Sequence, residues 1–410
     1  MKRLCLLLLG MTFCFWLGGV GIPCAVANPM SVPEILTESW QAYRQQFIQT
    51  DGRVIDREAD ARSISEAQAY AMWRAVLVGD QVTFDRVWRW GENNLNAQVR
   101  SQDSLWAWSW GKRPDGSWGV LDESVASDAD LDAAIALIFA HRLWKQPEYL
   151  NTARQKLKDL WRLCTAEVKG QRVFLPGEAD LFANTESSPE RLFSGLSFLP
   201  ASLMGSPPPR STYKLNPSYW GPYAFRIFAQ VDPDHDWNAL VTSSYALLQR
   251  IFQASPVGLP PDWILIDRQT GELLPIRSRP QENHYSFDAF RVWWRLALDA
   301  RYFSQSPAPG ILRQNLRFLA QRWRSQQKIE AVISTQGIPQ VDYASTAQYG
   351  ALYPAWVIVD PGLAEEIKTK ALDPVYNRGI WDSDTAYYTQ NLVWMGLSAG
   401  ELPPSQLLAP

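Results

Sequence analysis

Cysteine and histidine are scarce in this chain of 410 residues, which contains four cysteines and three histidines. Zinc and other transition-metal sites are built mainly from these side chains, so their scarcity argues against such a site. Three cysteines lie in the apolar N-terminal segment, and only Cys164 lies beyond it. If that segment is removed, no intrachain disulfide can form.

Basic blocks and long apolar runs are missing from most of the chain. The formal net charge is −3, and the lysines and arginines are dispersed. This distribution argues against a nucleic acid partner. Beyond the N-terminal segment, no stretch is long and apolar enough to cross a bilayer, so we predict no membrane span in the mature chain.

The N-terminus has the pattern of an export signal. A basic start precedes an apolar run over 4–20, and an A-x-A cleavage pattern occupies 25–27. We therefore predict a signal peptide over 1–27, a mature chain that begins at Asn28, and a secreted or periplasmic protein. The apolar run is also long enough for an uncleaved membrane anchor. N-terminal sequencing that began at Met1 would contradict cleavage.

Aromatic residues are abundant, with 20 tryptophans, 15 tyrosines and 16 phenylalanines against six methionines. Such rings supply a large apolar area and, in tryptophan and tyrosine, a polar group as well. The default location of a single tryptophan is the core. Their number here favours a cleft that stacks flat ligands.

The apolar spacing predicts a chain of amphipathic helices joined by turns. About a dozen helices without βαβ alternation indicate an all-α barrel of helical hairpins rather than a doubly wound sheet. Long loops over 111–125, 174–215, 255–286 and 374–386 are expected to carry function and a few short strands, for example around 263–267. No linker divides the mature chain, so 28–410 is predicted to be one domain. The predicted helices are 32–47, 65–78, 82–96, 128–144, 148–163, 219–229, 237–252, 287–303, 310–326, 346–357, 364–370 and 389–396.

Glu66 opens the second predicted helix and admits two interpretations. With Ser63 as the cap, Glu66 stands three residues later, as the partner in a capping box does. The other interpretation is a functional acid, because aromatic residues follow it at Tyr70 and Trp73. The local pattern alone favours the cap.

Asp128 lies in a run in which acids alternate, Ala126-Ser-Asp-Ala-Asp-Leu-Asp132. A calcium loop is excluded because its sixth position would be Ala133 instead of glycine and its twelfth would be Phe139 instead of glutamate. The run is typical of a helix start, with Ser127 or Asp128 as the cap.

Asp288 precedes Arg291 by three residues within aromatic surroundings. A surface ion pair is the simple interpretation. A nearby cation also keeps a carboxylate ionised for base chemistry, while burial against rings keeps another carboxyl protonated. Glycoside hydrolysis needs such a pair, and Glu66 and Asp288 have surroundings suited to the two roles.

Nearly the whole mature chain resembles glycoside hydrolase family 8, the family of the endoglucanases that accompany bacterial cellulose synthases. Several motifs occur in the family's order, and the Ala-Ser-Asp-Ala-Asp run is the most specific of them. The matching segments are Trp40-Gln-Ala-Tyr43, Asp51-Gly-Arg-Val54, Ser65-Glu-Ala-Gln-Ala-Tyr-Ala-Met72, Phe84-Asp-Arg-Val-Trp88, Trp106-Ala-Trp108, Ala126-Ser-Asp-Ala-Asp-Leu-Asp132 with Trp144, Asn216-Pro-Ser-Tyr219, Gly258-Leu-Pro-Pro-Asp-Trp263 and Tyr285-Ser-Phe-Asp-Ala-Phe-Arg291.

The resemblance implies an (α/α)6 barrel and inverting hydrolysis of internal β-1,4 bonds, without a cofactor. It implies that Glu66 is the general acid and that Asp288 is the base that activates water. It assigns substrate binding to the remaining matched residues: Asp128 at the cleaved sugar, Tyr219 and Arg291 around the water and the base, and Trp106 and Trp108 against sugar rings. The implied partners are a β-1,4-linked polysaccharide such as cellulose and an exopolysaccharide synthase complex, and we expect a monomer.

Two departures from the family pattern concern specificity more than catalysis. Family members usually have glycines where this chain has Ala67 and Ala71, and the added methyl groups would narrow the cleft wall or tighten the helix. Ala133 replaces an isoleucine or methionine, which we interpret as a packing change. Other β-1,4 polymers (xylan, chitosan, mixed-linkage glucan) therefore stay open as substrates. A non-hydrolytic glycan-binding protein of polysaccharide assembly is the alternative of a different class.

Overall fold

A computed structural model describes residues 30–97, 99–186, 210–400 and 405–408 of the chain. The chain divides into two units, Met1–Ser31 and Val32–Pro410, and only the second is described over most of its length. The predicted signal peptide over 1–27 lies outside the described residues. None of the described helices combines the length and the apolar character that a membrane crossing requires.

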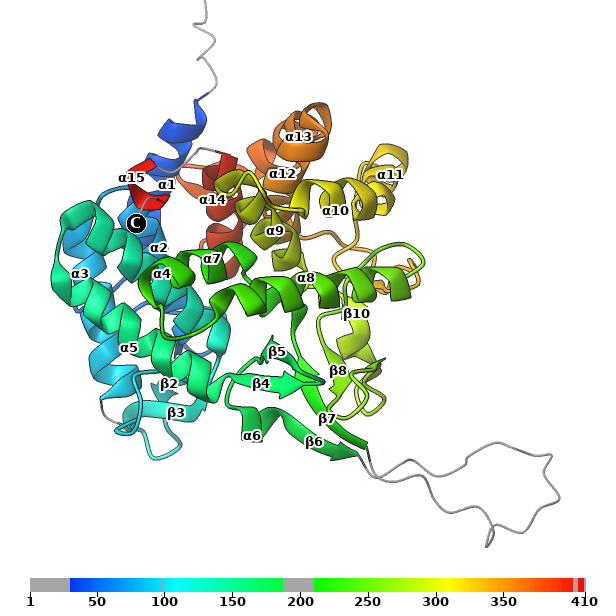
Figure 1. The fold of residues 1–410 in the computed structure, drawn as a ribbon. Coiled ribbons are helices and arrows are strands. Elements are labelled where there is room, and N and C mark those ends of the chain that lie inside the picture. The colour runs from blue at the N-terminus through cyan, green and yellow to red at the C-terminus, as the bar shows by residue number, and fades with distance from the viewer. Residues whose placement is uncertain (1–29, 98, 187–209, 401–404, 409–410) are drawn as a thin grey trace, which may run out of the picture. The chain divides into compact units, whose positions relative to one another are not determined.

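Six helices of the second unit form a closed inner ring. Each of them contacts the next one in the ring, and the last contacts the first. All of these helices are labelled in Figure 1. In chain order they are α2 (Ser65–Leu77), α4 (Ser127–Trp144), α7 (Pro222–Val231), α9 (Phe290–Tyr302), α12 (Thr346–Val359) and α14 (Tyr387–Gly400).

An outer helix packs against each inner helix, so the chain alternates between the two layers. Alternation of this kind makes helical hairpins, and six hairpins closed on themselves are an (α/α)6 barrel, as predicted. The outer helices are α1 (Val32–Phe47), α3 (Gln81–Gly91), α5 (Pro147–Leu163), α8 (Trp237–Ala254), α10 (Ala308–Asn315) and α13 (Pro361–Ile367). The short α11 (Arg317–Gln326) follows α10.

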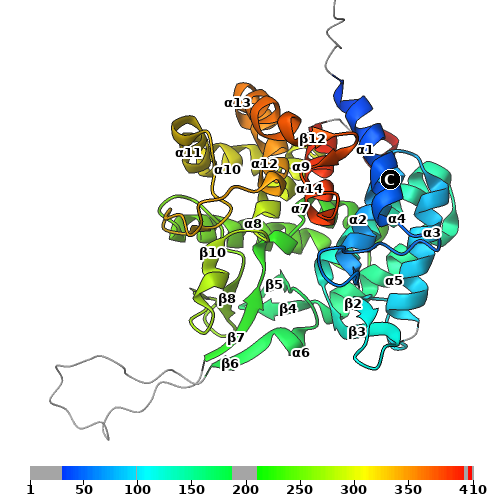
Figure 2. The same cartoon turned by 180° about the vertical axis from the view of Figure 1, so that it is seen from behind.

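The ring closes where the first and last parts of the second unit meet. Figures 1 and 2 both show α1 beside α14, which it contacts. The indole Nε1 of Trp394 in α14 donates a hydrogen bond of 2.9 Å to the carbonyl oxygen of Leu36 in α1. This contact joins segments that are more than 350 residues apart in the sequence.

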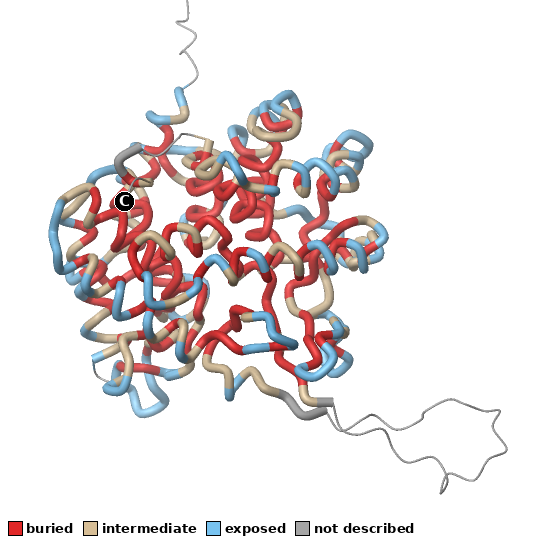
Figure 3. The backbone as a smooth tube through the Cα atoms, viewed as in Figure 1, coloured by how far each residue is buried: buried red, intermediate tan, exposed pale blue. Residues whose placement is uncertain are grey.

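The two layers differ in how their helices are buried. In α4 every residue from Ser127 to Ala140 is buried, as expected for a helix surrounded by others. By contrast, α5 buries one stripe only, made by Tyr149, Ala153, Lys156, Leu157 and Leu160 at helical spacing. Figure 3 shows the same contrast between the buried central helices and the exposed outer turns.

Glycines allow two inner helices to approach closely. Gly350 in α12 lies against the backbone of α14, and Gly396 in α14 lies against the backbone of Gly350. A methyl group on either residue would overlap main-chain atoms of the facing helix. Both positions therefore require a residue without a side chain.

Short antiparallel strands occupy the connections that lead into the inner helices. Figures 1 and 2 show β2 to β8 gathered beyond one end of the helices. One sheet has the order β1-β2-β3 and another β6-β7-β8-β9, and the rest are two-stranded. The strands are β1 (Ser63–Ile64), β2 (Ala107–Lys112), β3 (Trp118–Val125), β4 (Thr165–Val168), β5 (Gln171–Phe174), β6 (Ala183–Glu186), β7 (Arg210–Leu215), β8 (Ile264–Asp267), β9 (Leu273–Leu274), β10 (His284–Tyr285), β11 (Ile333–Ser334), β12 (Tyr376–Asn377) and β13 (Ile380–Trp381).

The predicted helices agree with the structure in place and differ at some ends. The predicted helix over 310–326 is two helices, α10 and α11. The predicted loop over 111–125 is mostly a strand of the β2–β3 hairpin, while the strand expected around 263–267 is β8. Two short helices were not predicted, α6 (Ala179–Phe182) and α15 (Ser405–Leu408).

Candidate active site

The N-terminal ends of four inner helices meet at one place. Glu66 is the second residue of α2, Asp128 the second of α4, Arg291 the second of α9 and Tyr387 the first of α14. Helix N-termini carry partial positive charge and stabilise nearby carboxylates. The closed ring thus gathers acids that the sequence places far apart.

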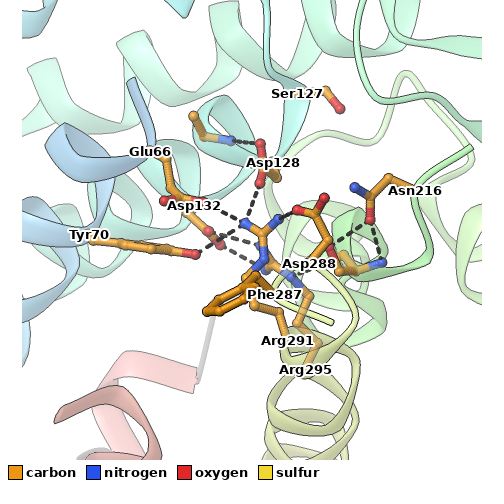
Figure 4. Close-up of polar contacts among 12 residues, drawn as sticks. Glu66, Tyr70, Ser127, Asp128, Asp132, Asn216, Phe287, Asp288, Arg291 and Arg295 are labelled. Carbon is orange, nitrogen blue, oxygen red and sulfur yellow. Dashed lines mark hydrogen bonds and ion pairs between the residues drawn. The ribbon is translucent and has the colours of Figure 1, made fainter. Parts of the chain in front are cut away.

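Arg291 joins three carboxylates with one guanidinium group (Figure 4). Its Nη1 donates to Glu66 Oε2 at 2.6 Å and to Asp128 Oδ2 at 2.7 Å, and its Nη2 donates to Asp288 Oδ1 at 2.6 Å. The Arg291 side chain is only 2% exposed, so the pair with Asp288 is not a surface ion pair. Within the described residues, no group of three or more His, Cys, Asp or Glu side chains is arranged to hold a metal ion.

The capping interpretations of Glu66 and Asp128 are both wrong. The N-cap of α2 is Ile64 and that of α4 is Ala126, and neither cap makes a side-chain hydrogen bond. Ser63 lies in β1, where its hydroxyl donates to the carbonyl of Val54. Glu66 Oε2 binds Arg291, and Asp128 uses Oδ2 for Arg291 while its Oδ1 accepts a hydrogen bond of 2.9 Å from the backbone N–H of Ala129.

Glu66 is surrounded by groups that favour its protonated form. Burial raises the pKa of its carboxyl to about 7, and the charges of Asp128 and Asp288 act in the same direction. Arg291 and a hydrogen bond of 3.2 Å from the Tyr387 hydroxyl to Glu66 Oε1 lower the pKa. Burial outweighs them, so Glu66 keeps its proton in mildly acidic solution.

Asp288 is the most accessible of the three acids, with 31% of its side chain exposed, against 15% for Glu66 and 2% for Asp128. Burial raises the pKa of Asp288 above its ordinary value although Arg291 opposes the rise, so the pKa is not lowered as the sequence predicted. The indole Nε1 of Trp263 donates to Asp288 Oδ2 at 3.0 Å. Donors on both oxygens stabilise the ionised form of this carboxyl.

Asp262 holds the turn that carries Asp288. Its Oδ1 accepts hydrogen bonds from the backbone N–H of Ser286 at 3.1 Å and of Ala289 at 2.8 Å, and its Oδ2 contacts the Ser286 hydroxyl. Burial, helped by the charge of Asp288, raises the pKa of Asp262 to about 7. Sequence reasoning missed Asp262, although it lies in the quoted Pro-Pro-Asp-Trp segment.

A second ion pair lies one helical turn further from the helix ends. Asp132 follows Asp128 by four residues and Arg295 follows Arg291 by four, so both pairs join α4 to α9. Arg295 donates to both oxygens of Asp132 at 2.9 Å, and its Nε donates to the carbonyl of Ser218. This fully buried pair fixes the separation of the two helices beneath the site.

A cavity of about 300 Å³ opens at Glu66 and Asp128. Trp263 and Phe182 lie on its wall with nearly parallel rings, 6.3 Å between centroids and 2° between planes. Flat aromatic surfaces beside carboxyl groups suit a ligand with apolar ring faces and hydroxyl edges. The other lining residues are Ile64, Ser65, Trp108, Ser124, Val125, Ala126, Pro176 and Tyr219.

The two tryptophans predicted to contact substrate differ in position. Trp108 is partly exposed and lines the cavity. Trp106 is completely buried, and its Nε1 donates a hydrogen bond of 3.2 Å to Glu92 Oε1. The Lys156 ammonium lies 4.3 Å from the centroid of its ring. The expected stacking of Trp106 on a sugar ring is thus corrected, because its ring is covered by protein.

The departures at Ala67, Ala71 and Ala133 are packing changes. All three residues are completely buried, and none of them lines the cavity. The added methyl groups of Ala67 and Ala71 therefore tighten the packing of α2 and do not narrow the cavity wall.

The closed ring of six helical hairpins places the protein among the (α/α)6-barrel proteins, and its cluster of carboxyl groups lies at one end of the ring. Residues 22–201 and 194–401 match the model of the glycosyl hydrolases family 8, so the chain belongs to that family.

Relatives and solved structures carry endoglucanase names. An endoglucanase of Xanthomonas axonopodis pv. citri (strain 306) is 35% identical over 264 residues, 64% of this chain and 60% of that protein. An endoglucanase of Escherichia coli (strain K12) is 31% identical over 258 residues, 62% of this chain and 60% of that protein. The chain thus spans about 60% of the length of these two curated relatives.

The solved structures show the same fold at lower identity. The endo-1,4-D-glucanase from Vibrio fischeri ES114 has a TM-score of 0.66 and 24% identity, covering 88% of this chain and 93% of that one. The endo-β-1,4-glucanase CMCax from Acetobacter xylinum has a TM-score of 0.66 and 22% identity, covering 90% of this chain and 99% of that one.

Proposed function

We propose that the protein is an inverting endo-β-1,4-glucanase in which Glu66 is the general acid and Asp288 the general base. The observation that carries this proposal is the binding of both carboxyls to Arg291, with Glu66 on the wall of an aromatic cavity. Membership of a glycosyl hydrolase family and the endoglucanase names of the relatives support it.

The proposed reaction uses the unequal surroundings of the two acids. Glu66, with a pKa of about 7, gives its proton to the glycosidic oxygen as the bond from that oxygen to the anomeric carbon breaks. Water attacks the anomeric carbon from the opposite face, and Asp288 takes one proton from that water. The products are two shorter chains, and the anomeric configuration is inverted.

Inversion is proposed from the resemblance to glycoside hydrolase family 8, and it sets a requirement on the spacing of the two carboxyls. Each acid is 2.6 Å from a different nitrogen of Arg291, so one guanidinium links them. Inverting enzymes hold their carboxyls ~6.5–9.5 Å apart to admit water, whereas retaining enzymes hold them ~5–5.5 Å apart. Proton NMR of the first products tests this step, and a β-anomer released first would contradict inversion.

The remaining predicted residues fit the binding of a sugar at the cleavage point. Asp128 lines the cavity and is held by Arg291, so it can accept a hydrogen bond from a sugar hydroxyl. Tyr219 lines the same wall, with its ring 5.3 Å from the Arg291 guanidinium carbon. We propose that Trp108 stacks against a sugar ring and that Arg291 positions the base.

Cellulose-like glucan is the proposed substrate, and other β-1,4 polymers are the alternative. Relatives named endoglucanase support glucan. Rex8A from Paenibacillus barcinonensis, whose structure was solved in complex with xylose, has a TM-score of 0.68 at 19% identity. This similarity concerns the fold and not the substrate. Comparing initial rates on carboxymethylcellulose, xylan, chitosan and mixed-linkage glucan decides among them.

The test of activity is the viscosity of carboxymethylcellulose with the purified protein and with Glu66→Gln. A fast fall in viscosity with few new reducing ends is expected for wild type, and none for the variant. If wild type neither lowers the viscosity of carboxymethylcellulose nor hydrolyses xylan, chitosan or mixed-linkage glucan, a non-hydrolytic glycan-binding protein becomes the better proposal. Retention of both Glu66 and Asp288 argues against that alternative.

Export, a monomeric state and a synthase partner stay proposals from the sequence. N-terminal sequencing of protein from the culture medium or the periplasm tests cleavage before Asn28. Sedimentation tests the monomer, and co-purification with an exopolysaccharide synthase tests the partner.

A further inference from the structure

Asp288, the proposed base, lies on a short turn of residues 286–289 between β10 and α9. Arg291 donates to its Oδ1 at 2.6 Å (Figure 4). Trp263 donates to its Oδ2 at 3.0 Å. These two contacts orient the carboxylate, but they do not hold the main chain that carries it. The distance from the base to the acid therefore also depends on the groups that hold the turn.

Asp262 holds the turn from one side. It is buried, with 7% of its surface exposed, and it directly precedes Trp263. One oxygen, Oδ1, accepts hydrogen bonds from the backbone N–H groups of Ser286 and Ala289, the first and last residues of the turn. The backbone N–H of Asp262 donates to the carbonyl of His284 at 2.7 Å, which ties Asp262 to β10. Of these two adjacent residues, Asp262 thus holds the main chain of the base and Trp263 holds its carboxylate.

Tyr388, the second residue of α14, holds the same turn from another side. Its hydroxyl donates to the carbonyl oxygen of Phe287, the residue directly before Asp288. The preceding residue, Tyr387, donates from its hydroxyl to Glu66 Oε1. Two adjacent hydroxyls at the start of one helix therefore hold the carboxyl of the candidate acid and the main chain of the candidate base.

We propose that Asp262 and Tyr388 are positioning residues that fix the distance between Asp288 and Glu66, an inference that rests on the proposed function. Neither residue needs to touch the sugar or the attacking water, because both act through the main chain of the turn. A shift of about 1 Å in a reacting group can lower turnover about 10²-fold. A displaced base weakens only the step in which water is activated, so kcat falls while KM changes little.

The main test compares Asp262→Ala with Asp262→Asn. Asp262→Ala removes the hydrogen bonds at both ends of the turn and should lower kcat on carboxymethylcellulose about 10²-fold, with little change in KM. In Asp262→Asn the carbonyl oxygen can accept from the same two N–H groups, and the NH2 group can donate to the Ser286 hydroxyl oxygen. The amide should therefore restore most of the lost kcat. If Asp262 itself took the proton from water, Asp262→Asn would be as inactive as Asp288→Asn, which would overturn the inference.

Tyr388→Phe keeps the ring and removes only the hydroxyl, so kcat should fall about tenfold, as expected for the loss of one hydrogen bond. A second substrate, 2,4-dinitrophenyl β-cellotrioside, shows which acid is affected, because its leaving group needs no proton. Glu66→Gln should recover on this substrate, whereas Tyr388→Phe and Asp262→Ala should not, because water must still be activated. Recovery of Tyr388→Phe would mean that it acts through Tyr387 on the acid, and the inference would be overturned.

Two control variants remove similar groups outside the site. Asp232 is also buried, and its Oδ2 accepts a hydrogen bond of 2.8 Å from the Trp237 indole in the connection that follows the C-terminal end of α7. Tyr245 of α8 donates from its hydroxyl to Asp299 Oδ2 at 2.6 Å. Asp232→Ala and Tyr245→Phe should lower Tm but keep wild-type kcat at temperatures where they are folded.

The outcomes separate this inference from the proposed function. Wild-type kcat in folded Asp262→Ala or in folded Tyr388→Phe overturns the inference and leaves the proposed function intact. Losses of kcat in the two control variants as large as those in the test variants also overturn it, because they would assign the effect to stability. A wild-type protein that hydrolyses neither substrate overturns the proposed function and this inference together.

Discussion

Replacing Glu66 by glutamine is expected to stabilise the protein at neutral pH while abolishing its activity. Burial raises the pKa of Glu66 from an ordinary 4.5 to about 7 in the folded chain. Below pH 4.5 the carboxyl is neutral in the folded and unfolded chains, so its ionisation does not change the free energy of unfolding. Between pH 4.5 and 7 only the unfolded chain ionises, so the free energy of unfolding of the wild type falls as pH rises.

The size of the effect follows from the same rise in pKa. A tenfold change in an acid constant corresponds to about 1.4 kcal/mol. Above pH 7 the Glu66 carboxyl therefore lowers the free energy of unfolding by about 3 kcal/mol. Glutamine has nearly the same shape and does not titrate. The stability difference between Glu66→Gln and wild type should therefore grow from pH 4.5 to 7 and then stay constant.

The measurement is the free energy of unfolding from urea titrations between pH 3 and 8. Glu330→Gln is a control of opposite sign, because the hydrogen bonds from Arg322 lower the pKa of buried Glu330. A lowered pKa contributes stability above the unfolded pKa, and this is lost as pH falls. The free energy of unfolding that Glu330→Gln loses relative to wild type should therefore be constant above pH 4.5 and shrink as pH falls below it. A Glu66→Gln difference that does not vary with pH would refute the reasoning.

Three further predictions concern residues around the cavity. Trp263→Phe removes the donor on Asp288 Oδ2, so the pKa of the base should rise and the acidic limb of the kcat/KM profile should move to higher pH. Trp108→Ala should raise KM with Tm unchanged, whereas Trp106→Ala should cost about 3–5 kcal/mol in unfolding titrations, since its ring is completely buried. Arg291→Lys should lower kcat/KM on carboxymethylcellulose by about 10²-fold or more, because one ammonium cannot bridge three carboxylates.

The order of helices could be predicted from the sequence because each helix carries its own apolar spacing. In α5, for example, the apolar positions repeat as one stripe, and the predicted range of 148–163 nearly equals the observed one. Periodicity does not say which helices are inner. That distinction depends on burial of all sides, as in α4 from Ser127 to Ala140. Asp128 and Asp132 can lie in this buried part because Arg291 and Arg295 pair with them.

The contacts of the site could be predicted only in part. Glu66 and Asp128 each resembled a helix cap, and the local pattern could not show that their partner, Arg291, lies far along the chain. Trp106 and Trp108 were indistinguishable in sequence, because burial is decided by Lys156 and Glu92 from other helices. The role of Asp262 depends on a turn whose geometry the sequence does not specify.

Closure of the ring and assembly of the candidate acid site are linked through α2 and α14. Glu66 belongs to the first inner helix, and the hydroxyl that binds it, Tyr387, belongs to the last. About two turns further along α2, Arg74 packs its buried guanidinium against Tyr43 of α1 and Trp394 of α14, with ring centroids at 4.2 and 4.9 Å. The helices that close the barrel therefore also place the hydrogen-bond partner of the acid. A substitution that loosens the contact of α1, α2 and α14 should therefore reduce turnover before it unfolds the core.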